Sequence, residues 1–173
     1  VLVLPEGREP VDLPLVGGHN LRNALAAAAV AHALGVPAAA IRQGLEGARP
    51  LPGRLEPVPT GLPFPVLVDY AHTPEGLRSV LAALREVTAR RLIVVFGAGG
   101  DRDRGKRGPM GEAVGSLADR VVVTSDNPRS EDPLVIAEAV AAGVRAAGGQ
   151  PEVVLDRRAA IARALQLADR DSL

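Results

Sequence analysis

Residues 125–133, SDNPRSEDP, place four charged side chains and an asparagine directly after the apolar run Val121–Val123. Pro128 and Asp132 suit a turn followed by the start of a helix, which leaves three polar residues that the turn does not need. The Arg129 guanidinium could bind a carboxylate, while Asp126 and Asn127 could accept hydrogen bonds from an ammonium group. This pattern is suited to binding a zwitterion, with both its carboxylate and its ammonium group.

A second polar stretch, FGAGGDRDRGKR (residues 96–107), follows the apolar run RLIVV. Its glycines, Gly97, Gly99 and Gly100, predict a turn whose backbone N–H groups could bind an anion. The dinucleotide fingerprint G-x-G-x-x-G is not met, because Arg102 stands at its third glycine. The charged residues that follow could also be a solvated run on a flexible turn.

A third stretch, DYAHTP (residues 69–74), ends the apolar run PVLVDY. An acid at a strand end, such as Asp69, can accept hydrogen bonds from ribose hydroxyls, and His72 follows three residues later. Thr73, Pro74 and Glu75 have a simpler explanation as the start of a helix. Asn20, with Asn23 behind it in HNLRN, could be a helix N-cap, and Arg54 in PGR could be an ordinary surface residue.

The elements that must position these residues alternate along the chain from residue 66 onward. Four nearly continuous apolar runs are each followed by a helical pattern, which predicts a Rossmann-like, mainly parallel α/β sheet with helices on both faces. The polar stretches then lie at the carboxyl edge of that sheet, where such folds bind ligands. Helices are predicted over residues 20–36 and 38–45, and residues 48–65, with six prolines, predict an interdomain linker with a short strand at 55–58.

Composition excludes several classes of protein. The 173 residues carry 20 basic and 20 acidic side chains, and this balance gives no general attraction to nucleic acid or to an anionic membrane. Aromatic residues make up 2%, so a base-stacking platform is not expected. The chain has no cysteine, which excludes disulfides and thiolate metal sites, and no apolar run long enough to span a membrane.

Taken together and in order, HNLRNALAAA, LPGRLE, VDYAHTPEGL, FGAGGDRDRGKRGPM and TSDNPRSEDP resemble the Mur ligase family over essentially the whole chain. The GGDRD and DNPR motifs are similar to those of its diamino-acid-adding members. The resemblance implies that residues 1–50 end a central ATP-binding domain and that residues 51–173 form a C-terminal Rossmann-like domain truncated at its end. It also implies a cytoplasmic, monomeric enzyme.

The resemblance further implies an ATP-dependent amide ligation in peptidoglycan synthesis, with Mg²⁺ offsetting the phosphate charge. ATP would phosphorylate a carboxylate of a UDP-N-acetylmuramoyl dipeptide, and the amine of meso-diaminopimelate would displace the phosphate. By this resemblance the ATP-binding positions are Asn20, Asn23, Arg54, Asp69 and His72. The positions that would bind the diamino acid are Arg102, Asp126, Asn127, Pro128 and Arg129.

The sequence departs from the family pattern at a few positions, with His19 in place of an aromatic residue, Ala98 in place of a cysteine, and Gly108-Pro109. The P-loop and the carbamylated lysine that help hold Mg²⁺ would lie before this chain, and a glycine-and-glutamate motif after it. We therefore expect no catalytic or metal-binding residue in the chain and no turnover by it alone. Two alternatives remain open: a lysine- or ornithine-adding ligase, or a non-catalytic nucleotide-binding module.

Overall fold

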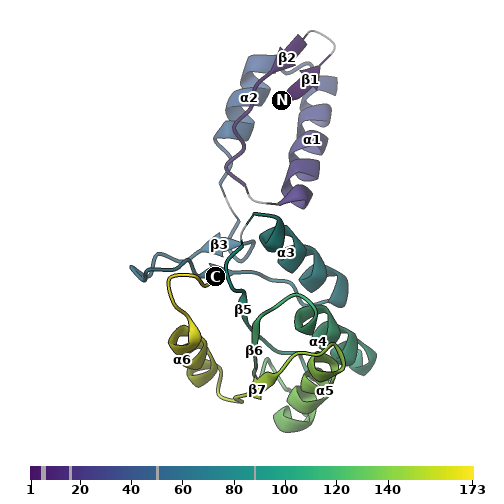
Figure 1. Cartoon of the computed structure of the whole chain (residues 1–173). Helices are drawn as coiled ribbons and strands as arrows, with labels where there is room; N and C mark the ends of the chain where they lie inside the picture. Colours follow the sequence, from purple (N-terminus) through teal and green to yellow (C-terminus); the bar gives the residue numbers. More distant parts are fainter. Residues whose placement is uncertain (5–6, 16, 50, 88) are drawn as a thin grey trace. The chain divides into compact units, whose positions relative to one another are not determined.

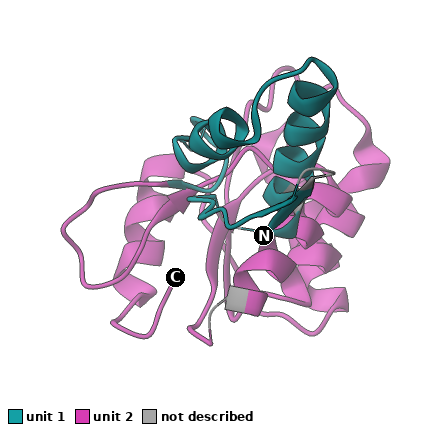
Figure 2. Cartoon of the chain, turned by 90° about the horizontal axis from the view of Figure 1, so that it is seen from above, with its two compact units in different colours: residues 1–56 teal, residues 57–173 magenta. Residues whose placement is uncertain are grey.

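The structure, a computed structural model, describes residues 1–4, 7–15, 17–49, 51–87 and 89–173. The chain divides into two compact units, Val1–Glu56 and Pro57–Leu173 (Figure 2). We describe each unit by itself.

Unit 1 combines a short hairpin with two helices (Figure 1). Its elements are β1 (Leu2–Leu4), β2 (Gly7–Glu9), α1 (Gly18–Ala33) and α2 (Ala38–Glu46). The strands pair antiparallel, and Leu2, Ala28 and Ile41 bring the hairpin and both helices into one small apolar core. Pro37 precedes α2 and Gly47 follows it, as expected for signals that start and stop a helix. The helices predicted at residues 20–36 and 38–45 are thus confirmed to within a few residues.

Unit 2 alternates strands and helices, as predicted. Its strands after the linker are β4 (Leu67–Val68), β5 (Ile93–Phe96), β6 (Arg120–Val123) and β7 (Pro151–Val153). Its helices are α3 (Pro74–Val87), the 3₁₀ turn η1 (Arg104–Lys106), α4 (Arg107–Gly115), α5 (Pro133–Ala146) and α6 (Arg157–Leu167). Prolines begin α3 and α5, where a missing N–H costs nothing.

The central sheet of unit 2 is parallel, in the order β5-β6-β7, with Ile93 opposite Arg120 and Val121 opposite Pro151. Helices cover both of its faces, with α6 on one side and α4 and α5 on the other (Figure 1). Val122 packs on Ala160 and Ala164 of α6. Its neighbours Val121 and Val123, also buried, point to the opposite face because strand side chains alternate. This confirms the predicted Rossmann-like class.

The strand β4 differs from the prediction. It forms a two-stranded ladder with β3 (Glu56–Pro57), and the described residues do not place it among the strands of the parallel sheet. The prediction that all four apolar runs share one sheet is therefore wrong at this strand. The Val58 N–H donates to the Val66 carbonyl at 2.8 Å, so the proline-rich segment, in which a short strand was expected, folds back on β4.

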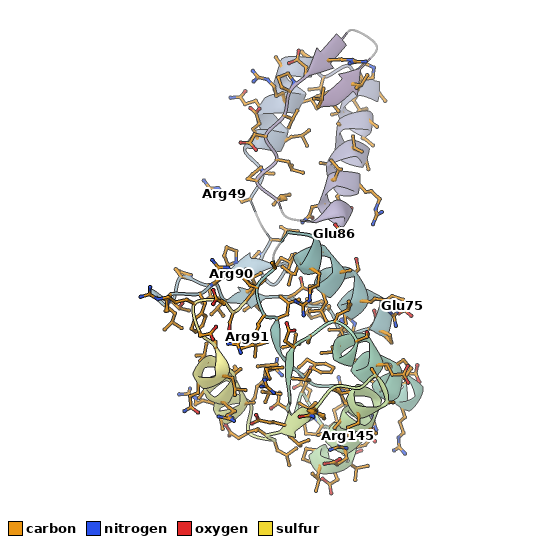
Figure 3. All side chains as sticks on the ribbon, viewed as in Figure 1. Arg49, Glu75, Glu86, Arg90, Arg91 and Arg145 are labelled. Atoms are coloured by element: carbon orange, nitrogen blue, oxygen red, sulfur yellow. The ribbon has the colours of Figure 1, made fainter. Side chains whose placement is uncertain are left out.

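The other edge of β5 is occupied by the last residues of the chain. The Arg91 N–H donates to the Asp171 carbonyl, and the Leu173 N–H donates to the Arg91 carbonyl, both at 2.7 Å. Arg91, labelled in Figure 3, also forms an ion pair with Asp169. Residues 171–173 thus run parallel beside the start of β5.

Candidate functional site

The loops that follow β5 and β6 carry most of the polar residues singled out in the sequence. Because these strands are parallel neighbours, both loops leave the same edge of the sheet. The loop after β5 holds Arg102, and the loop after β6 holds the run from Asp126 to Arg129. The structure therefore brings the five predicted diamino-acid-binding positions to one edge.

Glycines allow the two loops to approach backbone to backbone. A Cβ atom on Gly97 would lie 2.2 Å from the Thr124 carbonyl oxygen, and one on Gly100 would lie 1.9 Å from that of Pro128. The Gly100 N–H donates to the Asn127 carbonyl at 3.1 Å. The predicted anion cradle is therefore wrong at Gly100, because this N–H is used within the protein and the glycine is needed for close packing.

Three non-glycine residues of these loops adopt left-handed backbone conformations. Asp101 has φ 49°, Asn127 has φ 44° and Arg129 has φ 53°. Asp and Asn visit this region readily, but an arginine there costs about 1 kcal/mol or more. Arg129 is therefore the most strained residue of the edge, and other contacts must hold its backbone in place.

An ion-pair network lies beside Arg129. The Glu131 carboxylate accepts hydrogen bonds from both terminal nitrogens of Arg107 at 2.8 and 3.1 Å, and from the Asp101 N–H at 2.7 Å. Arg104 Nε lies 3.1 Å from the same carboxylate. The Arg107 side chain is 4% exposed and that of Glu131 is 10% exposed, whereas that of Arg104 is 74% exposed. The predicted solvated charge run is thus correct for Arg104 and wrong for Arg107.

The electrostatics of this network favour the ionised carboxylates. Hydrogen bonds from Arg107, then from the Asp101 N–H, lower the pKa of Glu131 to about 2. The pKa of Asp101 is also lowered, first by the hydrogen bond from the Ser130 hydroxyl and then by that from the Ser130 N–H. Both carboxylates are therefore charged at neutral pH. We call Asp101, Arg107, Ser130 and Glu131 the edge clamp.

The groups next to the edge clamp can bind a charged ligand. One terminal nitrogen of Arg129 donates to the Gly100 carbonyl at 2.6 Å, which orients a guanidinium that has further N–H donors. Arg129, Asn127 and Arg102 are exposed, and Asp126 and Pro128 are half-buried. The Asn127 amide nitrogen lies 3.3 Å from Asp126 Oδ1. The loops therefore present positive donors and oxygen acceptors on the same edge of the sheet.

The loop after β4 combines local structure with candidate binding groups. Thr73 Oγ1 accepts from the Gly76 N–H at 3.1 Å, which confirms the predicted helix start. Asp69 Oδ1 accepts from the Ala71 N–H at 2.8 Å. His72 Nδ1 lies 2.9 Å from the Tyr70 carbonyl, and the His72 carbonyl accepts from Lys106 Nζ at 3.2 Å. Lys106 therefore joins this loop to the one after β5.

The remaining candidates lie in unit 1. The helix α1 begins at Gly18 with Gly17 as its N-cap, so the interpretation of Asn20 as the N-cap is wrong. Asn20 is half-buried and Asn23 is exposed in the first turns of this helix. Arg54 is exposed, and its N–H donates to the Leu51 carbonyl at 3.0 Å. The side chain of His19 lies outside the described residues.

The four residues of the edge clamp were not predicted from the sequence. Its ion pair, Arg107 with Glu131, was considered only as part of a charge run and a turn. A signal was present, since two consecutive strands are followed by opposite charges, RGKR after one and SED after the other. In a parallel pair these stretches face each other at one edge.

The described residues contain no group of three or more His, Cys, Asp or Glu side chains arranged to hold a metal ion. No described helix combines the length and apolarity needed to span a membrane.

Residues 53–173 match the family described as "Mur ligase, glutamate ligase domain". This chain belongs to the Mur ligase family. The matched segment contains the whole parallel sheet and both loops of the edge clamp.

Two curated relatives of this Mur ligase chain have the same description. A UDP-N-acetylmuramoyl-L-alanyl-D-glutamate–2,6-diaminopimelate ligase of Caldanaerobacter subterraneus subsp. tengcongensis is 45% identical over 170 residues, 98% of this chain and 35% of the relative. A protein of the same description from Gloeobacter violaceus is 50% identical over 165 residues, 95% of this chain and 34% of the relative. The chain thus spans about a third of the length of these relatives.

Solved structures show the same fold. A ligase described in the same words superposes with a TM-score of 0.67 and 36% identity, covering 98% of this chain and 35% of that one. A folylpolyglutamate synthase of Mycobacterium tuberculosis, complexed with ADP and AMPPCP, gives a TM-score of 0.70 at 31% identity, covering 91% and 35%. The Mur ligase chain therefore shares its architecture with enzymes named for ligation and for glutamate addition.

Proposed function

We propose that this chain is part of an ATP-dependent amide ligase that adds meso-diaminopimelate to a UDP-N-acetylmuramoyl dipeptide in peptidoglycan synthesis. The observation that carries the proposal is the carboxyl edge of β5 and β6. There the exposed side chains of Arg129 and Arg102 lie on the same edge of the sheet as the oxygen acceptors of Asp126 and Asn127. The descriptions of the curated relatives support the same substrate.

The chemistry of the edge suits the far end of a diamino acid. Diaminopimelate carries an amine and a carboxylate at each end. The end that does not react is therefore a zwitterion distant from the reacting amine. Arg129 would bind the carboxylate through a charge-assisted fork, and Asp126 and Asn127 would accept from the ammonium group. Pro128 would shape the turn between them. Binding energy gained at this remote end would orient the amine that attacks the activated carboxylate.

ATP would activate the accepting carboxylate as an acyl phosphate, with Mg²⁺ offsetting the phosphate charge. Asp69 fits a ribose hydroxyl, since its carboxylate follows the end of β4 and can accept a hydrogen bond. His72, Arg54, Asn20 and Asn23 would complete the nucleotide contacts, on the family resemblance alone. On the same resemblance, we propose no metal ligand and no catalytic residue in this chain.

Two alternative functions differ from this proposal in the ligand of the edge or in the absence of ligation. A lysine lacks the second carboxylate, so a lysine- or ornithine-adding ligase would gain little from Arg129. A non-catalytic nucleotide-binding module would bind nucleotide without ligating any amino acid. We propose that the reaction takes place in the cytoplasm. We also propose that the enzyme is a monomer and has no nucleic-acid partner.

The test uses the full-length protein, because this chain spans about a third of its relatives. Ligation is measured with ATP, the UDP-linked dipeptide and, in parallel, meso-diaminopimelate, lysine and ornithine. Ligation of diaminopimelate at the highest kcat/KM supports the proposal. Preference for lysine or ornithine would favour the first alternative, and nucleotide binding without any ligation would favour the second.

The substitution Arg129→Ala tests the role of the edge. Losing a charge-assisted fork should cost about 2 kcal/mol or more, which raises the KM for diaminopimelate roughly 30-fold. The KM for ATP should change little. Arg145→Ala is the matched control, because Arg145 is an exposed arginine of α5 in a surface ion pair with Glu138. Equal KM values for diaminopimelate in both variants would refute the role of Arg129.

A further inference from the structure

The backbone of Arg129 is held in an unfavourable conformation from both sides. On one side, the carbonyl of Asn127 accepts from the Gly100 N–H at 3.1 Å. On the other side, Ser130 and Glu131 are bonded to the loop after β5. Arg129 itself, at φ 53°, lies between these attachments. An arginine released from them would be expected to return to a more favourable φ, and its guanidinium would move with it.

Glu131 is the centre of these attachments. Its carboxylate accepts from the Arg107 guanidinium and from the Asp101 N–H, and it forms an ion pair with Arg104. All three residues belong to the segment after β5. The bonds to Arg107 are anchored in the fold, since Arg107 is 3% exposed at the start of α4. A single carboxylate therefore ties the strained loop to a buried residue of the other segment.

The same attachments also orient the guanidinium of Arg129. The carbonyl that accepts from it belongs to Gly100, the residue immediately before Asp101. Asp101 is bonded through its N–H to Glu131 and through its carboxylate to Ser130. Moving Glu131 would thus displace both the backbone of Arg129 and the carbonyl that orients its side chain.

We propose that Glu131 is a positioning residue for diamino-acid recognition, acting through the edge clamp to hold Arg129 in its left-handed conformation and its guanidinium against Gly100. The inference rests on the proposed function of Arg129. It assigns Glu131 a role in specificity without contact with the substrate. The charge and the two-oxygen geometry of the carboxylate are both required, because Arg107 and Asp101 use both oxygens.

The test is a double-mutant cycle in the full-length enzyme with Glu131→Gln, Arg129→Ala and the two together. Glutamine keeps the shape but loses the charge and one acceptor. We expect Glu131→Gln to raise the KM for diaminopimelate about tenfold and to leave the KM for ATP within about twofold. If Glu131 acts through Arg129, the double variant should be no worse than Arg129→Ala alone. The inference would be overturned if the two substitutions multiplied their effects on the KM for diaminopimelate in the double variant. It would also be overturned if Glu131→Gln raised the KM for diaminopimelate and the KM for ATP equally.

Glu138→Gln is the matched control. Glu138 also accepts from an arginine, at 3.2 Å from Arg145, but both side chains are about half exposed and lie on the surface of α5. The KM for diaminopimelate should not change in this variant. A rise like that of Glu131→Gln would show that loss of any such ion pair is sufficient, which contradicts a specific role for Glu131.

A second variant covers the case in which Glu131→Gln does not fold. Ser130→Ala removes only the exposed hydrogen bond from the Ser130 hydroxyl to Asp101, at 2.8 Å, and should leave the melting temperature nearly unchanged. It should raise the KM for diaminopimelate about two- to threefold. An unchanged KM, together with an unfolded Glu131→Gln variant, would assign Glu131 to folding alone and overturn the inference.

The same measurements distinguish a failure of the proposed function from a failure of the role of Glu131. If the wild-type enzyme ligates no diamino acid, the proposed function fails before any variant is compared. If it does, and Arg129→Ala raises the KM while Glu131→Gln does not, only the role of Glu131 is refuted.

Discussion

The segments that follow β5 and β6 meet twice, and the two contacts are built in opposite ways. At the carboxyl edge they meet through the edge clamp, with charged side chains and left-handed residues. Further along, α4 and α5 meet through glycines. A Cβ atom on Gly111 would lie 2.1 Å from the Val140 carbonyl oxygen, and one on Gly143 would lie 2.1 Å from that of Gly108.

The difference separates support from recognition. At Gly111 and Gly143 the helix contact is backbone against backbone, and the atoms nearest these two glycines belong to no titratable side chain, so pH and salt should hardly affect it. The edge clamp is partly exposed and depends on the charge of Glu131. We infer that the glycine contact fixes where the loops begin, and that the edge clamp adjusts the side chains that they present.

The largest effect is expected from Gly111→Ala. The added methyl group has no room beside the Val140 carbonyl, so α4 and α5 must separate, at a cost of about 1–3 kcal/mol or more. Urea denaturation of this chain measures the loss. Gly108→Ala is the control in the same helix, because a Cβ there meets no atom within 4 Å. It should be neutral or stabilising by up to about 1 kcal/mol, and equal losses in both variants would refute the close contact.

A smaller loss of stability, caused by the edge clamp alone, is expected at acidic pH. The folded-state pKa of Glu131 is about 2, against an ordinary value of 4.5. Because the folded pKa is lowered, this carboxylate stabilises the fold fully above about pH 4.5, and the contribution is lost as pH falls towards 2. The groups that face it are Arg107, Arg104 and the Asp101 N–H.

Melting temperatures of the wild type and Glu131→Gln, measured between pH 6 and pH 2.5, test this expectation. The wild type should lose more stability on acidification than the variant, so that the two curves converge at low pH. Parallel curves would show that Glu131 does not carry the pH dependence. Gly111→Ala should run parallel to the wild type throughout, because its contact holds no titratable group.

Much of the framework could be predicted from the sequence because its signals are local. Pro74 and Pro133 begin helices, and the run Val121–Val123 is a buried strand. The position of the candidate site followed from the rule that ligands bind at the carboxyl edge of a parallel sheet. The pairing of β4 was missed, since an apolar run predicts a strand but carries no information on which strand lies beside it.

The internal order of the site could not be predicted, because it depends on contacts between distant residues. Arg104 and Arg107 look alike in RDRGKR, yet only Arg107 becomes buried against Glu131. The left-handed conformation of Arg129 has no local signal, since arginine does not favour it. Which of these residues contact ATP or a diamino acid stays a prediction.

The smallest effect is expected where the two contacts join. Asp132 follows Glu131 and caps α5 by accepting from the Leu134 N–H at 2.8 Å. Asp132→Ala should cost about 1 kcal/mol of stability, as should Asp156→Ala at the N-cap of α6. In the full-length enzyme the KM for diaminopimelate should stay within about twofold in both, because the bonds of Glu131 do not pass through the cap. A rise with Asp132→Ala alone would mean that the start of α5, rather than the carboxylate of Glu131, holds Arg129, and the division between support and recognition would then fail.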